Sequence, residues 1–331
     1  MSGGEPSPPT STMTGTPVPL IPVPLIMGPT GAGKTDLALR LAARYPIEIV
    51  SVDSAMVYRG MDIGTGKPAP ELLERFPHHL VDILDPSQSY SAGQFVRDAL
   101  QAIAAIRGRG NLPVLVGGTM LYFRALRRGL AEMPPADARV RQEIDAEAAH
   151  AGWPALHARL ALLDPVTAQR IQPNDGQRIQ RALEVHRLTG RTLSELHSQT
   201  RPADPDMTFA AFAWAPSDRE FLYAGIERRF EQMMQAGLLD EVRRLQQRGD
   251  LHADLPAIRS VGYRQLWEHL CGGESLASSV RKAIFATRHL ARRQLIWLRA
   301  ENDIQWHDSL DSHAADQIER AVATFCSRHS V

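Results

Sequence analysis

Eight consecutive residues near the start of the chain have the types and spacing of a phosphate-binding loop. They are Gly28, Pro29, Thr30, Gly31, Ala32, Gly33, Lys34 and Thr35. The order fits the pattern GxxxxGK followed by Ser or Thr, in which a glycine-rich turn points backbone N–H groups at phosphate oxygens. Lys34 would reach two phosphates, and Thr35 would offer its hydroxyl to Mg²⁺. The loop therefore predicts a di- or triphosphate ligand and leaves open what is done with it.

A carboxylate follows the next apolar run, at Asp53. Loops that follow parallel strands meet at one edge of the sheet, so Asp53 is expected beside the phosphate loop. There it could act as a general base or hydrogen-bond acceptor, or it could simply cap a turn or helix.

The acidic strand end that usually holds Mg²⁺ in nucleotide hydrolases has no counterpart in the expected place. The apolar run at 113–116 stops at two glycines and Thr119, with no carboxylate. Asp82 and Asp85 lie near another strand end and could substitute. A small-molecule kinase and an enzyme that releases diphosphate both remain open.

Strand-like and helix-like segments alternate around these residues. Strands are expected at 24–27, 47–52, 79–84, 113–116, 208–215 and 303–307, and helices at 34–44, 95–107, 218–248, 260–270 and 275–300. Units of about 30 residues are typical of βαβ crossovers. The pattern predicts an α/β protein with a parallel sheet of the P-loop NTPase type, flanked by helices.

Residues 132–200 show no strand signal, read as helices and lie between proline clusters, so they predict an all-helical insertion. The expected organisation is an α/β catalytic core at 21–131 and 201–310, the insertion at 132–200, and a C-terminal helical tail at 311–331. Residues 1–20 are rich in Pro, Ser, Thr and Gly, lack the features of a secretion signal and are expected to be disordered.

Composition excludes several classes of protein. No apolar run reaches the ~18 residues of a membrane span. The two cysteines, Cys271 and Cys326, have no metal-ligand spacing, and the 12 histidines form no HExxH motif, which disfavours zinc sites and metal hydrolysis. The 37 basic and 37 acidic residues balance. Residues 275–300, however, contain six Arg or Lys and no acid, which suits a nucleic-acid backbone.

Six further strings are similar to those of one protein family. They are SVDSAMVYRGMDIGTGKP at 51–68, DPSQSYSA at 85–92, VGGTMLY at 116–122, NDGQRIQRALEV at 174–185, SVGYR at 260–264 and TRHLARRQLIWLR at 287–299. With the phosphate loop, they resemble the tRNA dimethylallyltransferases, also called isopentenyl-tRNA transferases, over about residues 24–310. Members of this family transfer a dimethylallyl group from its diphosphate to the exocyclic amine of adenosine 37, immediately 3′ of the anticodon, in tRNAs that read codons beginning with U.

The resemblance implies roles for individual residues. Residues 28–35 and Arg229 would hold dimethylallyl diphosphate, with Lys34 and Thr35 acting on the leaving group and Mg²⁺ as the cofactor. Asp53 would receive the proton or hydrogen bond of the adenine amine. Contacts with the tRNA anticodon stem-loop are implied at Asp53, Ser54, Ala55, Met56, Thr119, Arg141, Gln177, Arg178, Ile179, Gln180, Arg181, Arg259, Ser260, Val261, Gly262, Tyr263, Arg264, Arg292, Arg293, Gln294, Trp297 and Arg299.

The expectation is a Mg²⁺-dependent transferase that acts as a cytoplasmic monomer without a membrane partner. Two alternatives from other classes are a P-loop kinase of a small metabolite, with the helical insertion as its lid, and a nucleotide-dependent switch. ATP consumption with no dependence on RNA would favour the kinase.

Overall fold

The computed structural model describes residues 20–131, 133–200 and 202–329. Within these ranges the strands form one sheet in the order β3-β2-β4-β1-β5-β6, with every pair parallel. Their bounds are β1 (Ile21–Met27), β2 (Ile47–Val52), β3 (His78–His79), β4 (Leu112–Gly117), β5 (Met207–Ala215) and β6 (Ile304–Asp308). The predicted parallel sheet is confirmed, including its last short strand.

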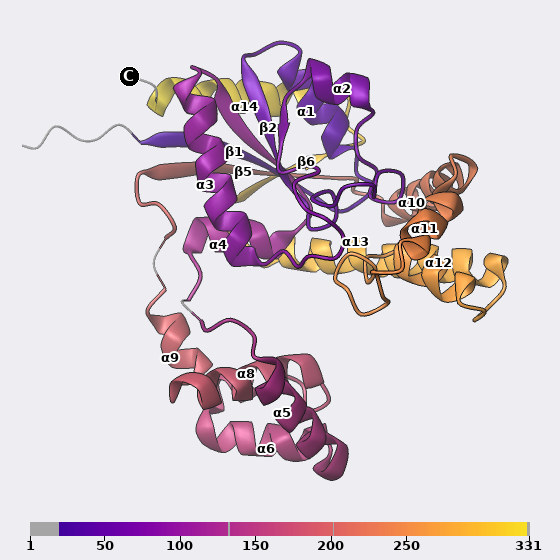
Figure 1. Ribbon diagram of the computed structural model, residues 1–331. Helices are drawn as coiled ribbons and strands as arrows, with labels where there is room; N and C mark the ends of the chain where they lie inside the picture. The colour runs from indigo at the N-terminus through magenta and orange to yellow at the C-terminus, as the bar shows by residue number, and fades with distance from the viewer. Residues whose placement is uncertain (1–19, 132, 201, 330–331) are drawn as a thin grey trace, which may run out of the picture.

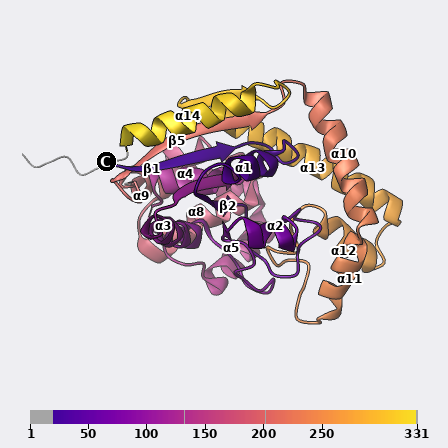
Figure 2. The same ribbon diagram turned by 90° about the horizontal axis from the view of Figure 1, so that it is seen from above.

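Helices cover both faces of the sheet, which explains why its central strands are almost continuously apolar and buried. On one face lie α3 (Ala92–Gly108) and α4 (Met120–Arg128), packed against side chains of β1, β2, β4 and β5. On the other lie α1 (Lys34–Ala42) and α14 (Ala314–His329). Figure 2 shows α14 and α3 on opposite sides of β1.

A helical arm extends beside the carboxyl edge of the sheet (Figure 1). It consists of α10 (Arg219–Gln235), α11 (Leu238–Gln247), α12 (Tyr263–Leu270) and the first part of α13 (Leu276–Arg299). These helices share an apolar cluster with residues 57–63. Helix α13 joins the two parts, because Ala283 packs in the arm whereas Leu298 packs under the sheet. The short helix α2 (Pro70–Arg75) precedes β3.

The strand predicted at 79–84 is wrong beyond His79. Leu80 has φ 62° and Asp82 has φ 55°, so the backbone leaves the extended conformation immediately after β3. The apolar residues that suggested a strand pack in different places. Leu80 belongs to the cluster under the sheet, and Leu84 packs against the cluster of the arm.

The segment predicted as an all-helical insertion is helical in its described residues, 133–200. It contains α5 (Ala138–Ala151), α6 (Trp153–Leu163), α7 (Pro165–Ala168), α8 (Gly176–Thr189) and α9 (Leu193–Ser198). Their apolar faces form a separate core, and Figure 1 shows them as a unit apart from the sheet. The tail predicted at 1–20 falls, except for Leu20, outside the described residues. Among the described helices, none has the length and apolar character needed to cross a membrane.

Candidate functional site

Three loops come together at the carboxyl edge of the sheet. Strands β1, β2 and β4 end at one level, because Met27 and Val52 both pair with Gly117. The phosphate loop, Asp53 and Thr119 follow these strand ends and therefore lie side by side, as the parallel topology predicts. A hydrogen bond joins two of the loops, since the Ser54 amide donates to Thr119 Oγ1 over 3.1 Å.

The phosphate loop presents a cation and a helix N-terminus to the same space. Gly33 has φ 79° and begins α1, whose first-turn N–H groups have no partners within the helix and attract anions. Lys34 Nζ donates to the Pro29 carbonyl over 2.7 Å. Burial lowers the pKa of Lys34 from 10.5 to about 8, while the charge of Asp53 opposes this shift. Lys34 forms no ion pair with any described residue, so its ammonium is available to an anion.

Arg229 of α10 supplies a second cation from the opposite wall. Burial lowers its pKa, and the nearby charges of Asp53 and Asp36 oppose that effect. In the part of the chain that the structure describes, Arg229 has no ion-pair partner either. Two unpaired cations thus flank Asp53, an arrangement that can neutralise a diphosphate.

Asp53 is fixed at the turn that follows β2. Its Oδ1 accepts hydrogen bonds from the amides of Ala55 (2.8 Å) and Met56 (3.2 Å). Among the described groups, none donates to Oδ2. One carboxylate oxygen therefore holds the turn, and the other can accept a hydrogen bond or proton from a ligand.

Two hollows meet at Asp53. The first, of about 560 Å³, is lined by the phosphate loop, Asp36, Met56, Thr65, Gly66 and Arg229, and we call it the diphosphate cavity. The second, of about 580 Å³, lies between the turn after β2, the start of α4, the 256–263 segment and α13, and we call it the groove. Residues that line both hollows include Thr30, Asp53, Arg229 and Gln294. Ligands in the two hollows would meet beside the Asp53 carboxylate.

The groove gathers many of the residues implied to contact RNA. Its lining includes Asp53, Ser54, Ala55, Thr119, Arg178, Arg259, Ser260, Val261, Tyr263, Arg293, Gln294 and Trp297. Arg178 reaches it from the insertion, Arg259 from the loop before α12 and Arg293 from α13. Trp297 is partly exposed, and the Arg124 guanidinium lies 5.8 Å from the centre of its ring.

Gln294 has a structural task that the sequence did not indicate. Its Oε1 accepts from the Thr30 amide, and its Nε2 donates to the Gly118 carbonyl, each over 2.8 Å. The side chain thereby ties α13 to the phosphate loop and to the end of β4.

Two implied RNA contacts require correction, because their side chains are buried. Ile179 is 0% exposed and packs in the core of the insertion. Tyr263 is also 0% exposed, and its hydroxyl donates to Glu241 Oε1 over 2.6 Å. The Tyr263 ring therefore forms the floor beneath the groove and does not offer a surface on which a base could stack.

Other implied contacts lie away from the groove or already have partners. Arg141 and Arg181 both pair with the buried carboxylate of Glu184, and Gln180 donates to Asp145. At about 100° per residue, Arg292 and Arg299 lie on the opposite side of α13 from Gln294 and Trp297, and both are exposed. Gln177, Gly262 and Arg264 are not part of the groove lining, although Gln177 and Arg264 are exposed.

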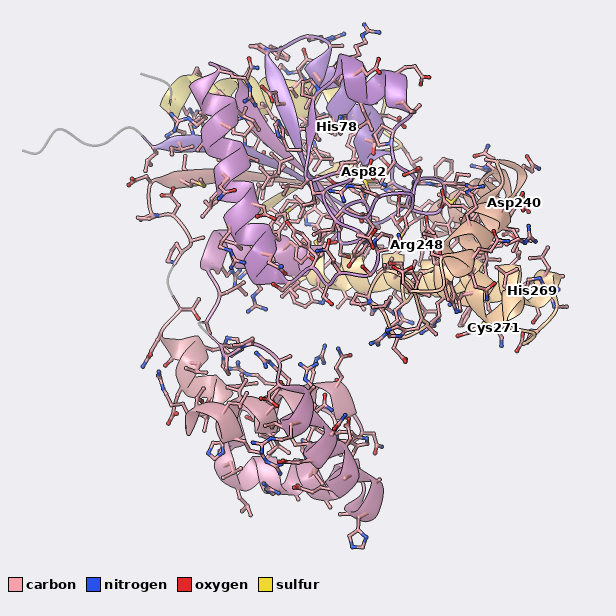
Figure 3. The ribbon with its side chains drawn as sticks, in the orientation of Figure 1. His78, Asp82, Asp240, Arg248, His269 and Cys271 are labelled. Carbon is pink, nitrogen blue, oxygen red and sulfur yellow. The ribbon has the colours of Figure 1, made fainter. Side chains whose placement is uncertain are left out.

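Asp82 and Asp85 do not replace the missing strand-end carboxylate. Asp82 accepts a hydrogen bond from Lys67, and Asp85 forms a bidentate pair with Arg248, which holds the pKa of Asp85 well below its usual range. In Figure 3, Asp82 and Arg248 lie between the sheet and the outer end of the helical arm, where His269 and Cys271 are found. Among the described residues no group of three His, Cys, Asp or Glu side chains could enclose a metal ion.

Several residues of the diphosphate cavity were missed by the sequence reasoning. Thr65 and Gly66 lie in the 51–68 string. That string resembles the family, but it did not indicate that these two residues line a ligand cavity. Arg228 and Gln232 of α10 also line the cavity, and nothing in a single helical sequence shows which side meets a ligand.

Two family models match the chain. One, described as IPP transferase, matches residues 56–301, and another, described as isopentenyl transferase, matches residues 21–82. Two proteins named tRNA dimethylallyltransferase, from Cupriavidus necator and Bordetella petrii, are each 53% identical to this chain over 304 residues. The aligned regions cover 90% and 91% of this chain, and 94% and 97% of the relatives.

Solved structures of proteins with related names also superimpose on this chain. The full-length tRNA isopentenylpyrophosphate transferase from Bacillus halodurans superimposes with a TM-score of 0.68 and 36% identity, covering 93% of this chain and 97% of that protein. A eukaryotic dimethylallyltransferase, described as acting on tRNA, superimposes with a TM-score of 0.77 and 25% identity, covering 93% of this chain and 80% of that protein.

Proposed function

Because the chain belongs to the tRNA dimethylallyltransferase family, we propose that it transfers a dimethylallyl group from dimethylallyl diphosphate to the N6 amine of a tRNA adenosine. The observation that carries this proposal is the position of Asp53 at the meeting point of the two hollows. One hollow suits a diphosphate, and the other has arginines and a tryptophan that suit RNA. The same family resemblance supports adenosine 37 as the target, in tRNAs that read codons beginning with U.

The diphosphate cavity is suited to a prenyl diphosphate. Lys34, Arg229 and the first-turn amides of α1 stabilise the negative charge that grows on the leaving group as the allylic C–O bond breaks. Apolar side chains of Ile49, Met56 and Val116 line the same cavity. They would accept the dimethylallyl group and keep water from the electron-deficient carbon.

Mg²⁺ fits this cavity as a cofactor held mainly by the substrate. Thr35 lines the cavity together with Asp36 and Asp53. Mg²⁺ commonly binds through one or two protein oxygens, substrate phosphates and waters, so a protein cage is not required. When bound, the ion would neutralise diphosphate charge, and Thr35 would be its hydroxyl ligand.

The transfer step needs a nucleophile held beside Asp53. The adenine amine would attack the first carbon of the dimethylallyl group, the new N–C bond would form, and the electron pair of the C–O bond would leave with diphosphate. Asp53 Oδ2 would accept the amine proton, while Oδ1 keeps its bonds to the amides of Ala55 and Met56. Thr119 lies next to this carboxylate and would orient the base.

The groove would bind an unpaired loop of RNA. An adenine within a stack cannot reach Asp53, so the base must be extruded. Arg178, Arg259 and Arg293 would contact phosphates, and Trp297 would stack against a base. These contacts support the anticodon stem-loop as the bound part of the tRNA.

We propose that the protein acts as a monomer. The tRNA substrate supports action in the cytoplasm. Gel filtration with light scattering in the presence of tRNA would test the first of these proposals, and a mass of two chains per active complex would contradict it.

The direct test is incubation with labelled dimethylallyl diphosphate, Mg²⁺ and unmodified tRNA. We expect label in the RNA, release of diphosphate and no requirement for ATP. Turnover of ATP with a small acceptor and no label in RNA would instead identify the kinase alternative, which family membership does not favour.

A further inference from the structure

A buried carboxylate outside the proposed reaction holds the turn at residues 62–67. Glu241 of α11 is 2% exposed. It accepts hydrogen bonds from the consecutive amides of Asp62 (2.9 Å), Ile63 (2.9 Å) and Gly64 (3.2 Å), and from the Tyr263 hydroxyl (2.6 Å). Four donors satisfy this carboxylate, so its burial is stable only in this arrangement.

The other end of the turn has its own buried anchor. The Lys67 side chain is 3% exposed, and its ammonium donates to the Tyr58 carbonyl (2.6 Å), to Asp62 Oδ1 (2.7 Å) and to Asp82. The turn is therefore fixed at both ends by charged groups, Glu241 and Lys67. Neither of them lines the diphosphate cavity or the groove.

The middle of the turn lies directly against Arg229. Gly66 has φ +67°, and a Cβ added to it would lie 1.8 Å from an Nη atom of Arg229. The guanidinium thus rests on a bare Cα, with Met233 on the same side. Arg229 pairs with no described carboxylate, and its guanidinium lies against this turn.

We propose that Glu241 is a positioning residue, which holds the 62–67 turn so that Gly66 places Arg229 on the diphosphate. The inference rests on the proposed function through the role of Arg229. The same carboxylate also holds Tyr263 beneath the groove, so it fixes one wall of each hollow relative to the other.

The first test compares two glycines with the same backbone conformation. Gly60 has φ +72° and open space around its Cβ position, whereas Gly66 has φ +67° and no such space. Gly66→Ala and Gly60→Ala introduce similar backbone strain, but only the first displaces Arg229. We expect Gly66→Ala to raise the KM and Kd for dimethylallyl diphosphate by at least about tenfold, the scale of one hydrogen bond to a charged group. Gly60→Ala should leave both near the wild-type values. Equal effects of the two variants would overturn the proposal.

The second test is a double-mutant cycle on diphosphate binding, measured by calorimetry with dimethylallyl diphosphate and Mg²⁺. Glu241→Gln turns an N–H donor toward the turn amides and should weaken binding by at least about tenfold. In the Arg229→Ala background the same change should have little further effect, because its action runs through Arg229. Additive losses would make Glu241 a general stability residue and overturn the inference. If Glu241→Gln does not fold, Gly66→Ala replaces it in the cycle.

This readout separates the inference from the proposed function. The calorimetry contains no RNA, so a wild-type protein that binds the diphosphate but never labels tRNA would contradict the proposed function alone. A wild-type protein whose binding does not depend on Arg229 would overturn the inference itself.

Discussion

Asp53 divides its two carboxylate oxygens between structure and chemistry. Oδ1 closes the turn after β2 by accepting two amide hydrogen bonds, and Oδ2 has no donor among the described residues. Lys34 and Arg229 lie close enough for their charges to interact with it.

Asp53→Asn separates the two tasks of this side chain. The amide keeps an oxygen that can accept from Ala55 and Met56, but it has no basicity. We expect the single-turnover rate of prenyl transfer to fall by about two to four orders of magnitude, the scale of a positioned acid–base group. Binding of tRNA, measured by filter retention, should be nearly unchanged. A large loss of affinity with normal turnover would instead make Asp53 a binding residue.

The lowered pKa of Lys34 predicts a pH limit on diphosphate binding. With a pKa of about 8, the ammonium is present below that pH and is lost as the pH rises through it. We expect kcat/KM for dimethylallyl diphosphate to decline above about pH 8, by up to about tenfold per pH unit. The decline in kcat should come at higher pH, because the bound diphosphate stabilises the ammonium.

Lys34→Arg is the control for this assignment, since a guanidinium stays charged throughout the same pH range. The variant should be slower, because a planar guanidinium does not replace a compact ammonium. The decline in its kcat/KM above about pH 8 should disappear. Persistence of the decline at the same pH would show that another group controls it.

Helix α13 shows at the element scale what a single sequence can and cannot reveal. The acid-free stretch at 275–300 indicated a basic surface. It did not indicate that Arg293 and Trp297 line the groove while Arg292 and Arg299 point to the other side, because the side that meets a ligand depends on the packing of the whole helix.

Arg292 and Arg293 therefore form a matched pair for testing the groove. Arg293→Gln should weaken tRNA binding and reduce the slope of log K against log salt by about one, the value for one lost phosphate contact. Arg292→Gln, on the same helix with the same change in charge, should alter the affinity less. Equal losses of affinity and slope would show that RNA binds the outer side of α13 as well.

The elements that the sequence predicted well are those with local signals. The phosphate loop, the strand before it and Asp53 depend on short-range pattern, and the structure places them together. Tyr263 and the 79–84 segment were misjudged because their roles depend on distant partners. Tyr263 meets Glu241 on another helix, and the 79–84 run supplies apolar side chains to two different clusters.

The net charge of the whole molecule does not indicate an RNA-binding site. The chain is balanced at 37 basic and 37 acidic residues, yet the groove collects Arg178, Arg259 and Arg293 from three distant segments. Folding therefore brings arginines that lie far apart in the sequence into one groove.

The insertion has an apolar core of its own, so a mutation can destabilise it without destabilising the sheet. Glu184 is 0% exposed and accepts from the Asp137 amide, Arg141 and Arg181. Glu184→Ala should destabilise this unit by about 1–3 kcal/mol, since these donors lose their acceptor while the arginines remain partly solvated. Hydrogen exchange should rise in the insertion and not in the sheet. Binding of tRNA should weaken more than binding of dimethylallyl diphosphate.

Glu143→Ala is the control in the same unit, because the Glu143 side chain is 52% exposed and its pairs with Arg139 and Arg187 are long, at 3.9 Å and 3.8 Å. An exposed pair of this kind contributes little, so exchange should stay at the wild-type level. Uniform loss of protection across sheet and insertion in Glu184→Ala would contradict the separation of the two cores.

The central claim is that Asp53 lies where a prenyl diphosphate and a tRNA adenosine meet. The most direct measurement is mass spectrometry of nucleosides from unmodified tRNA that has been incubated with dimethylallyl diphosphate, Mg²⁺ and either the wild-type protein or Asp53→Asn. We expect N6-dimethylallyl adenosine at position 37 with the wild-type protein, and a strongly reduced yield with the variant. Unmodified adenosine in both samples, although dimethylallyl diphosphate binds to the protein, would contradict this claim about Asp53.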